Sequence, residues 1–159
     1  PPAWILGGAM RSEPTIYAGR DEVNPRAGRD CAKDVYAQAG ISDPRREFDC
    51  AEIYVPFSWY EPMWLENLGF ADQGEGWRLT LDGATSLDEG GDIPWNCSGG
   101  VLSSNPIGAS GMIRFAEAAR QVRGDADQHQ VEDARLALGH AYGGGAQFFS
   151  MWVVGANKP

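Results

Sequence analysis

The sequence has little positive charge. Only 13 of its residues are lysine or arginine, against 22 aspartates and glutamates, which gives a formal net charge of −9. A surface of this sign repels phosphate backbones and anionic lipid, so a role on nucleic acid or on a membrane surface would need a local basic patch. The sequence has no such patch, and we expect neither kind of partner.

Cysteines and long apolar runs are scarce as well. Cys31, Cys50 and Cys97 are widely spaced, with no C-x-x-C pair and no histidine at ligand spacing, which argues against a disulfide framework and against a zinc or other metal site. No apolar run approaches membrane-spanning length, and the first residues, PPAWILGG, lack the charged region and long apolar core of a signal peptide. We therefore expect a protein of the reducing cytoplasm, not of a membrane.

Hydrophobic periodicity predicts a single α/β domain. The 159 residues, 43% of them hydrophobic, are enough to bury a core. The expected strands are 3–9, 48–54, 136–141 and 148–154, with a possible short one at 77–81, and the expected helices are 28–40, 59–68 and a third that begins near residue 106 and ends before 124. Gly40 and Gly124 are expected to end helices, and residues 10–25 to form a loop. Together these elements predict a five-stranded mixed sheet with helices on both faces, its last two strands antiparallel.

The third helix is expected to bury an apolar face. Met112, Phe115, Ala116, Ala119 and Val122 recur at helical spacing. They are expected to point inward, with the charged residues outside.

A glycine-rich stretch at residues 95–111, WNCSGGVLSSNPIGASG, leads into that helix. Such a turn brings backbone N–H groups and the positive end of a helix dipole close to whatever lies above them. Asn105 followed by Pro106 has the order of an N-cap and a first helical residue, which adds about 1 kcal/mol of stability. We therefore expect this stretch to border the functional pocket.

Three segments in this order, AEIYVPF, NCSGGVLSSNPIGASG and GHAYGGG, resemble the second half of the thiolase superfamily. The tract QVRGDADQHQV is similar to the QLRGEAG-x-x-Q-V tract of that family, and the likeness extends over almost the whole chain. It is nearest to the sterol-carrier-protein-type thiolases and their relatives named as lipid-transfer proteins. The resemblance implies that residues 1–159 form a thiolase-like C-terminal domain. It also implies that the acyl-accepting cysteine belongs to an N-terminal half outside this chain.

The segments depart from the family pattern where the chemistry is expected. Tyr54 stands where sterol-carrier-type thiolases begin a His-Asp-Cys-Phe tract, and Asn105 replaces the histidine of a Gly-His-Pro tract. Tyr142 follows an alanine at the place where many thiolases have Cys-Ile-Gly-Gly-Gly. The usual base of Claisen chemistry is therefore missing from this chain.

The resemblance implies roles for five residues. The side-chain amide of Asn105 and the backbone N–H of Gly143 would donate to a thioester oxygen, and the hydroxyls of Tyr54 and Tyr142 would act as donors or acids. His140 would be the one imidazole near the pocket. Each side chain also has a structural alternative, which is an N-cap for Asn105, a hydrogen-bonded strand end for His140 and ring packing for the tyrosines. Cys97 is expected to be a small buried residue and not a nucleophile.

Three functions remain open at the level of sequence. The first is the C-terminal half of an acyl-CoA acyltransferase, with acyl-CoA as substrate and no cofactor. It would be inactive without an N-terminal half from the same or a separate chain, and it would work in a homo- or hetero-oligomer. The second is an aldol lyase on a CoA-linked, steroid-type side chain, which needs no cysteine. The third is a non-catalytic scaffold, for instance a partner of a small OB-fold acyl-CoA-binding protein.

Overall fold

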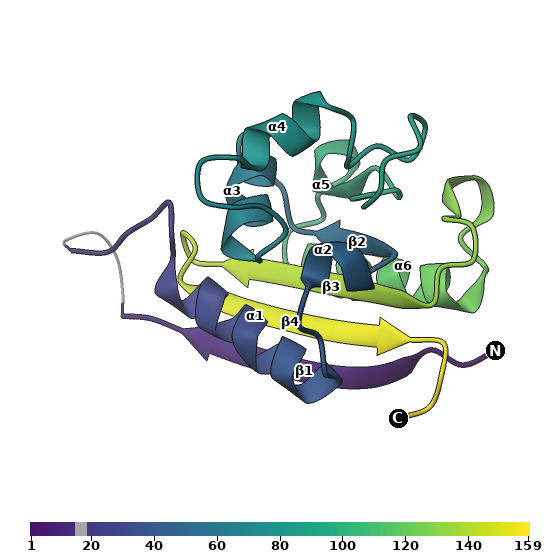
Figure 1. Cartoon of the computed structure of the whole chain (residues 1–159). Coiled ribbons are helices and arrows are strands. Elements are labelled where there is room, and N and C mark those ends of the chain that lie inside the picture. The colour runs from purple at the N-terminus through teal and green to yellow at the C-terminus, as the bar shows by residue number, and fades with distance from the viewer. Residues whose placement is uncertain (15–18) are drawn as a thin grey trace.

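The computed structural model describes residues 1–14 and 19–159, and its core is a mixed β-sheet. Within these residues, the sheet has four strands in the order β1-β4-β3-β2 (Figure 1). The strands are β1 (Trp4–Ser12), β2 (Cys50–Ile53), β3 (Leu136–Gly143) and β4 (Phe148–Gly155). β1 and β3 pair antiparallel with β4, whereas β2 pairs parallel with β3. The antiparallel pairing expected for the last two strands is confirmed.

Helices cover both faces of this sheet, as the sequence predicts. α1 (Arg26–Ala39) and α3 (Tyr60–Asn67) share a core cluster with Leu138 and Met151, whereas α6 (Ser110–Arg123) packs on the other face against Ala137 and Val154. Figure 1 shows α1 in front of the sheet and α6 behind it. The remaining helices are short, namely α2 (Pro44–Glu47), α4 (Gly76–Leu81), α5 (Gly100–Ser103) and the 3-10 turn η1 (Asp127–His129). Among helices of the described ranges, none is both long and apolar enough to cross a membrane.

The prediction of a fifth strand at residues 77–81 is wrong, because this segment is part of helix α4. The alternation of Trp77, Leu79 and Leu81 suggests a strand, but only Leu79 is partly buried, and it packs against the core. α4 packs against α3, where a Cβ at Gly76 would come within 2.3 Å of the Pro62 carbonyl oxygen. The place beside β2 where a fifth strand would pair is taken by a single parallel bridge from Ala51 to Trp95.

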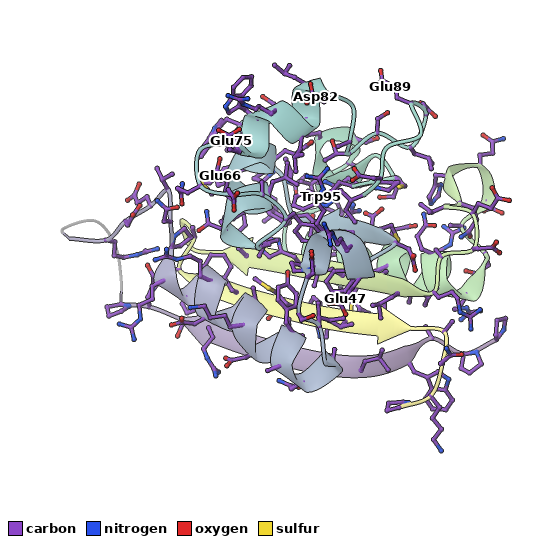
Figure 2. All side chains as sticks on the ribbon, in the orientation of Figure 1. Glu47, Glu66, Glu75, Asp82, Glu89 and Trp95 are labelled. Atoms are coloured by element: carbon purple, nitrogen blue, oxygen red, sulfur yellow. The ribbon has the colours of Figure 1, made fainter. Side chains whose placement is uncertain are left out.

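The acidic excursion from 71 to 94 forms the outer part of the molecule. Figure 2 shows Glu75, Asp82 and Glu89 on its outside, whereas Trp95 lies inside, between the excursion and the sheet. Trp95 is 6% exposed and meets the ring of Phe70 edge-on. The end of the excursion is therefore attached to the core through Trp95, the residue that follows it. A loop is expected at residues 10–25, but in the structure its first residues belong to β1, which extends to Ser12. Residues 15–18 of the expected loop lie outside the described residues.

The third helix starts later than expected, and its buried face agrees with the expected one only in part, since Val122 is buried and Phe115 packs against the core. Asn105 is not its N-cap, since α6 begins at Ser110 and the main chain around Pro106 forms a separate turn. Met112 is 62% exposed, and the buried residues of α6 are Ser110, Arg114, Ala118, Gln121 and Val122. The expected helix ends at Gly40 and Gly124 are confirmed, with φ of 73° and 74° in the left-handed region.

Candidate functional site

Two tyrosines meet where β2 and β3 end. The two strands are parallel, so Tyr54, which follows β2, and Tyr142, near the end of β3, emerge at the same edge of the sheet. Their ring centroids lie 5.1 Å apart, with the rings nearly perpendicular. The ring of Tyr60 also lies close to that of Tyr142, with the centroids 5.2 Å apart. The topology therefore brings two residues 88 positions apart into one aromatic cluster.

Asn105 joins this cluster through its side-chain oxygen. Its Oδ1 accepts one hydrogen bond from the Tyr54 hydroxyl at 3.3 Å and another from Ser110 Oγ at 2.6 Å. Both bonds go to the oxygen, and the NH₂ group of this exposed residue has no acceptor among the described residues. An exposed amide of this kind can donate to a carbonyl or enolate oxygen.

Gly143 is the last residue of β3 and borders open space. A Cβ built at this position has no atom within 4 Å, and a shallow depression of about 190 Å³ lies beside it, lined by Tyr142 and Phe148. The position is thus accessible to a ligand that also reaches Tyr142. Of the five residues expected at the site, Tyr54, Asn105, Tyr142 and Gly143 lie at this one edge.

His140 lies beneath the cluster and not in it. Its side chain is fully buried, and its ring faces those of Trp64 at 5.2 Å and Phe149 at 6.0 Å. Burial lowers the pKa of His140 to about 3, so the ring is neutral near pH 7. Tyr54 N lies 3.3 Å from His140 Nδ1 and 3.2 Å from its carbonyl oxygen. This geometry favours the structural alternative, in which the imidazole holds the backbone of Tyr54.

The buried imidazole predicts a pH dependence of stability. In the unfolded chain a histidine binds its proton below about pH 6.5, whereas in the fold His140 stays neutral down to about 3. The unfolded state therefore binds more protons in this window, and stability falls as the pH falls through it. We expect His140 to cost about 2.5 kcal/mol between pH 7 and pH 4.5. Urea unfolding of the complete protein at both pH values, compared with His140→Gln, measures this. The wild-type loss should persist in His129→Gln, which removes the other imidazole, and an equal loss in His140→Gln would contradict the assignment.

Tyr142 is held in its protonated form. Burial raises its pKa above the ordinary tyrosine value, and the neighbouring hydroxyls of Tyr60 and Tyr54 add to the shift. A tyrosine that keeps its proton near pH 7 serves as a hydrogen-bond donor or an acid. Tyr142 can thus stabilise negative charge on a ligand.

A buried ion pair, which the sequence did not predict, supports the glycine-rich stretch. Arg114 of α6 donates to Glu52 of β2 at 2.5 Å and to Ser98 Oγ at 2.9 Å, and both charged side chains are at most 3% exposed. Ser98 donates to Glu52 from its hydroxyl and its backbone. Burial raises the pKa of Glu52, while Arg114 and the Ser98 bonds oppose that rise. The signal in the sequence is a glutamate inside an otherwise apolar strand.

The turn itself is fixed to β2 by Asn96. This residue has a left-handed φ of 52°, its Oδ1 accepts from Ile53 N at 2.7 Å, and its own N–H donates to the Ala51 carbonyl at 2.8 Å. Cys97 follows it, half-buried, and burial raises the pKa of its thiol to about 12. A thiol of this kind is a poor nucleophile near pH 7. Within the described ranges, no group of three His, Cys, Asp or Glu side chains is arranged to hold a metal ion.

Comparison with protein families and with curated proteins gives a consistent assignment. The model of the family described as thiolase C-terminal domain-like matches residues 8–156. The chain is 34% identical over 145 residues to an acetyl-CoA acetyltransferase of Methanothermobacter thermautotrophicus. This alignment covers 90% of this chain and 37% of the acetyltransferase. It is 33% identical over 129 residues to sterol carrier protein 2 of Homo sapiens, and that alignment covers 80% of this chain and 23% of sterol carrier protein 2. The chain therefore spans well under half the length of these relatives.

Solved structures agree with the fold. A structure titled Ltp2-ChsH2(DUF35) aldolase superposes with a TM-score of 0.85 at 30% sequence identity, over 99% of this chain and 40% of that one. A monomeric SCP2-thiolase like protein type 1 from Mycobacterium smegmatis superposes with a TM-score of 0.69 at 18% identity, over 99% of this chain and 30% of that one. The second likeness concerns the fold alone.

Proposed function

Because this chain belongs to the thiolase C-terminal domain-like family, we propose that it is one half of a two-half site for acyl-CoA and that the complete site is an aldol lyase. The other half would come from an N-terminal domain on the same or a separate chain, since the chain spans 37% of the acetyltransferase it matches. The observation that carries the proposal is the contact of Tyr54 with both Asn105 and Tyr142, next to a histidine that stays neutral near pH 7. The likeness to an aldolase at 30% identity supports it.

Retro-aldol cleavage suits a site with these groups. In a β-hydroxyacyl thioester, a base takes the hydroxyl proton, the Cα–Cβ bond breaks, and its electrons form a thioester enolate. The hydroxyl carbon leaves as a ketone or aldehyde, and a proton returned to the α-carbon completes the shortened thioester. Atoms and charge balance without a second substrate. The reaction needs a proton acceptor and donors for the enolate oxygen, but no cysteine.

Each group at the edge of the sheet has a part in this scheme. The Asn105 amide and the Gly143 N–H donate to the enolate oxygen, where hydrogen bonds strengthen as negative charge develops. Tyr142, which is protonated near pH 7, donates its proton to the α-carbon. Tyr54, whose hydroxyl donates to Asn105 in the free site, takes the proton of the substrate hydroxyl as its own hydroxyl proton passes to Tyr142. Each tyrosine therefore ends the turnover with one proton.

Acyl transfer is the second candidate. It is favoured by the names of the matched relatives, an acetyl-CoA acetyltransferase and a benzoylsuccinyl-CoA thiolase subunit BbsB of Thauera aromatica. In that case the half outside this chain would supply the cysteine that accepts the acyl group, and Asn105 and Gly143 would bind the thioester oxygen. Both candidates need a partner half, and the two-component title of the aldolase structure supports an assembly with a further protein. If the complete protein does neither reaction, the scaffold alternative remains.

The products distinguish these functions. The complete protein is incubated with a β-hydroxyacyl-CoA in the absence of free CoA, and the mixture is analysed by mass spectrometry. The aldol lyase gives a shortened acyl-CoA and an equal amount of ketone or aldehyde. An acyltransferase instead needs free CoA or leaves an acylated cysteine, and a carbonyl product that appears only with free CoA would contradict the lyase.

A further inference from the structure

The turn between β3 and β4 has an unusual backbone. Gly144, Gly145 and Ala146 follow one another with φ of 62°, 62° and 58°. This left-handed conformation costs an alanine about 1 kcal/mol, and Ala146 is also buried, at 3% exposure. The turn is closed by a hydrogen bond from Gln147 N to the Gly143 carbonyl at 2.9 Å. Its conformation therefore determines how the Gly143 peptide is presented.

Three successive carbonyl groups of this turn accept hydrogen bonds from one remote segment. The Arg20 guanidinium donates to the Ala146 carbonyl at 2.6 Å and to the Gly145 carbonyl at 3.4 Å. The backbone N–H of Glu13 donates to the Gln147 carbonyl at 3.1 Å. The left-handed segment is thus bound along its length by two residues that lie more than 120 positions before it.

Arg20 is itself held in place. Its Nε donates to Glu13 Oε1 at 2.5 Å, and the two side chains are only 10% and 12% exposed. The second carboxylate oxygen of Glu13 accepts from Ala27 N at 2.7 Å, in the first turn of α1. A chain of contacts therefore runs from the start of α1 through Glu13 and Arg20 to the turn that follows Gly143.

We propose that Arg20, oriented by Glu13, is a positioning residue that sets the Gly143 peptide for the oxyanion. This inference rests on the proposed function, because it takes Gly143 N–H to bind the thioester oxygen. An oxyanion donor acts through a fixed position, and a small displacement weakens a bond that is strongest in the transition state. Loss of the guanidinium should lower kcat while substrate binding, which depends on other contacts, changes little.

The test uses the complete protein and four variants. Arg20→Met removes the donors to the turn but leaves Glu13 buried without its cation, which can impair folding. The double variant Glu13→Gln/Arg20→Met avoids the unpaired charge and retains an oxygen that can accept from Ala27. Arg20→Lys keeps the charge without the two-pronged geometry. Arg26→Met is the control, because it removes one positive charge from a side chain that is 85% exposed and pairs with Asp30 on the same helix.

We expect the double variant to lose 10- to 100-fold in kcat, by analogy with the ~10²-fold or greater cost of losing an oxyanion donor outright. KM should change less than about 3-fold, Arg20→Lys should recover part of the loss, and Arg26→Met should keep the wild-type kcat. Amide exchange of residues 143–147 should rise in the double variant. A folded double variant with wild-type kcat and wild-type exchange would overturn the inference, as would a loss confined to KM.

The same measurements separate this inference from the proposed function. If the complete protein has no lyase activity, the proposed function fails, and the amide exchange of the turn then decides whether Arg20 fixes it. If the lyase is active and kcat is unchanged in the double variant, the role of Arg20 fails and the lyase remains.

Discussion

If the complete protein is the proposed lyase, removal of the hydroxyl from Tyr54 or Tyr142 is expected to lower its kcat by about 10²- to 10⁴-fold, the usual contribution of a positioned acid or base. The two rings meet edge-on at 5.1 Å, so phenylalanine preserves the packing and removes only the proton-transferring group. Because the proposed scheme passes one proton between the two hydroxyls, the double variant Tyr54→Phe/Tyr142→Phe should be little worse than the poorer single variant. Steady-state kinetics with a β-hydroxyacyl-CoA measure this.

A third tyrosine provides the matched control. Tyr36 of α1 is likewise partly buried, and its hydroxyl donates to the Leu68 carbonyl at 2.9 Å, away from the site. Tyr36→Phe should cost about 1 kcal/mol of stability and leave kcat unchanged. If the Tyr54/Tyr142 double variant retains the wild-type kcat while folded, the lyase scheme is excluded, and acyl transfer through the other half becomes the stronger candidate.

Local signals in the sequence predicted most of the fold. Helix ends at Gly40 and Gly124 need a left-handed residue, and glycine supplies it at either place without tertiary help. The strand expected at 148–154 lies within β4, and the helix expected at 28–40 overlaps α1, because each has a continuous apolar pattern. The resemblance to thiolases added what no local signal contains, namely that Tyr54, Asn105 and Tyr142 lie together in the fold.

The sequence failed where partners come from distant segments. The side chain of Asn105 could cap a helix, but its oxygen instead accepts from the nearby Ser110 and from Tyr54, which only the tertiary fold brings near. The periodicity of α6 favoured Met112 as a buried residue, yet the buried face carries Arg114. A count of apolar positions assigns an arginine to the surface, and it cannot reveal a glutamate 62 residues earlier that pairs with it.

The buried pair of Glu52 and Arg114 gives the largest expected effect on stability. Arg114→Met would leave the Glu52 carboxylate, which is 1% exposed, with Ser98 as its remaining partner, and an uncompensated buried charge of this kind costs about 3–5 kcal/mol. The loss should shrink in acid, because a protonated Glu52 no longer places a charge in the core. Urea unfolding of the complete protein at pH 7 and near pH 5 measures both effects.

Removal of both charges distinguishes a buried ion pair from simple loss of packing. In Glu52→Gln/Arg114→Met no charge is left in the core, and the glutamine can still accept from Ser98, so most of the stability lost in Arg114→Met should return. Arg120→Met is the control on the same helix, since Arg120 is 36% exposed in its pairs with Glu117 and Asp127 and should contribute less than about 1 kcal/mol. A double variant as unstable as Arg114→Met would mean that the arginine acts through its packing against the glycine-rich turn. If the double variant recovers the full stability, the ion pair adds no net stability, and its role is to align β2, α6 and that turn. The alignment of Asn105 with Tyr54 would then be the property to measure in the same variant.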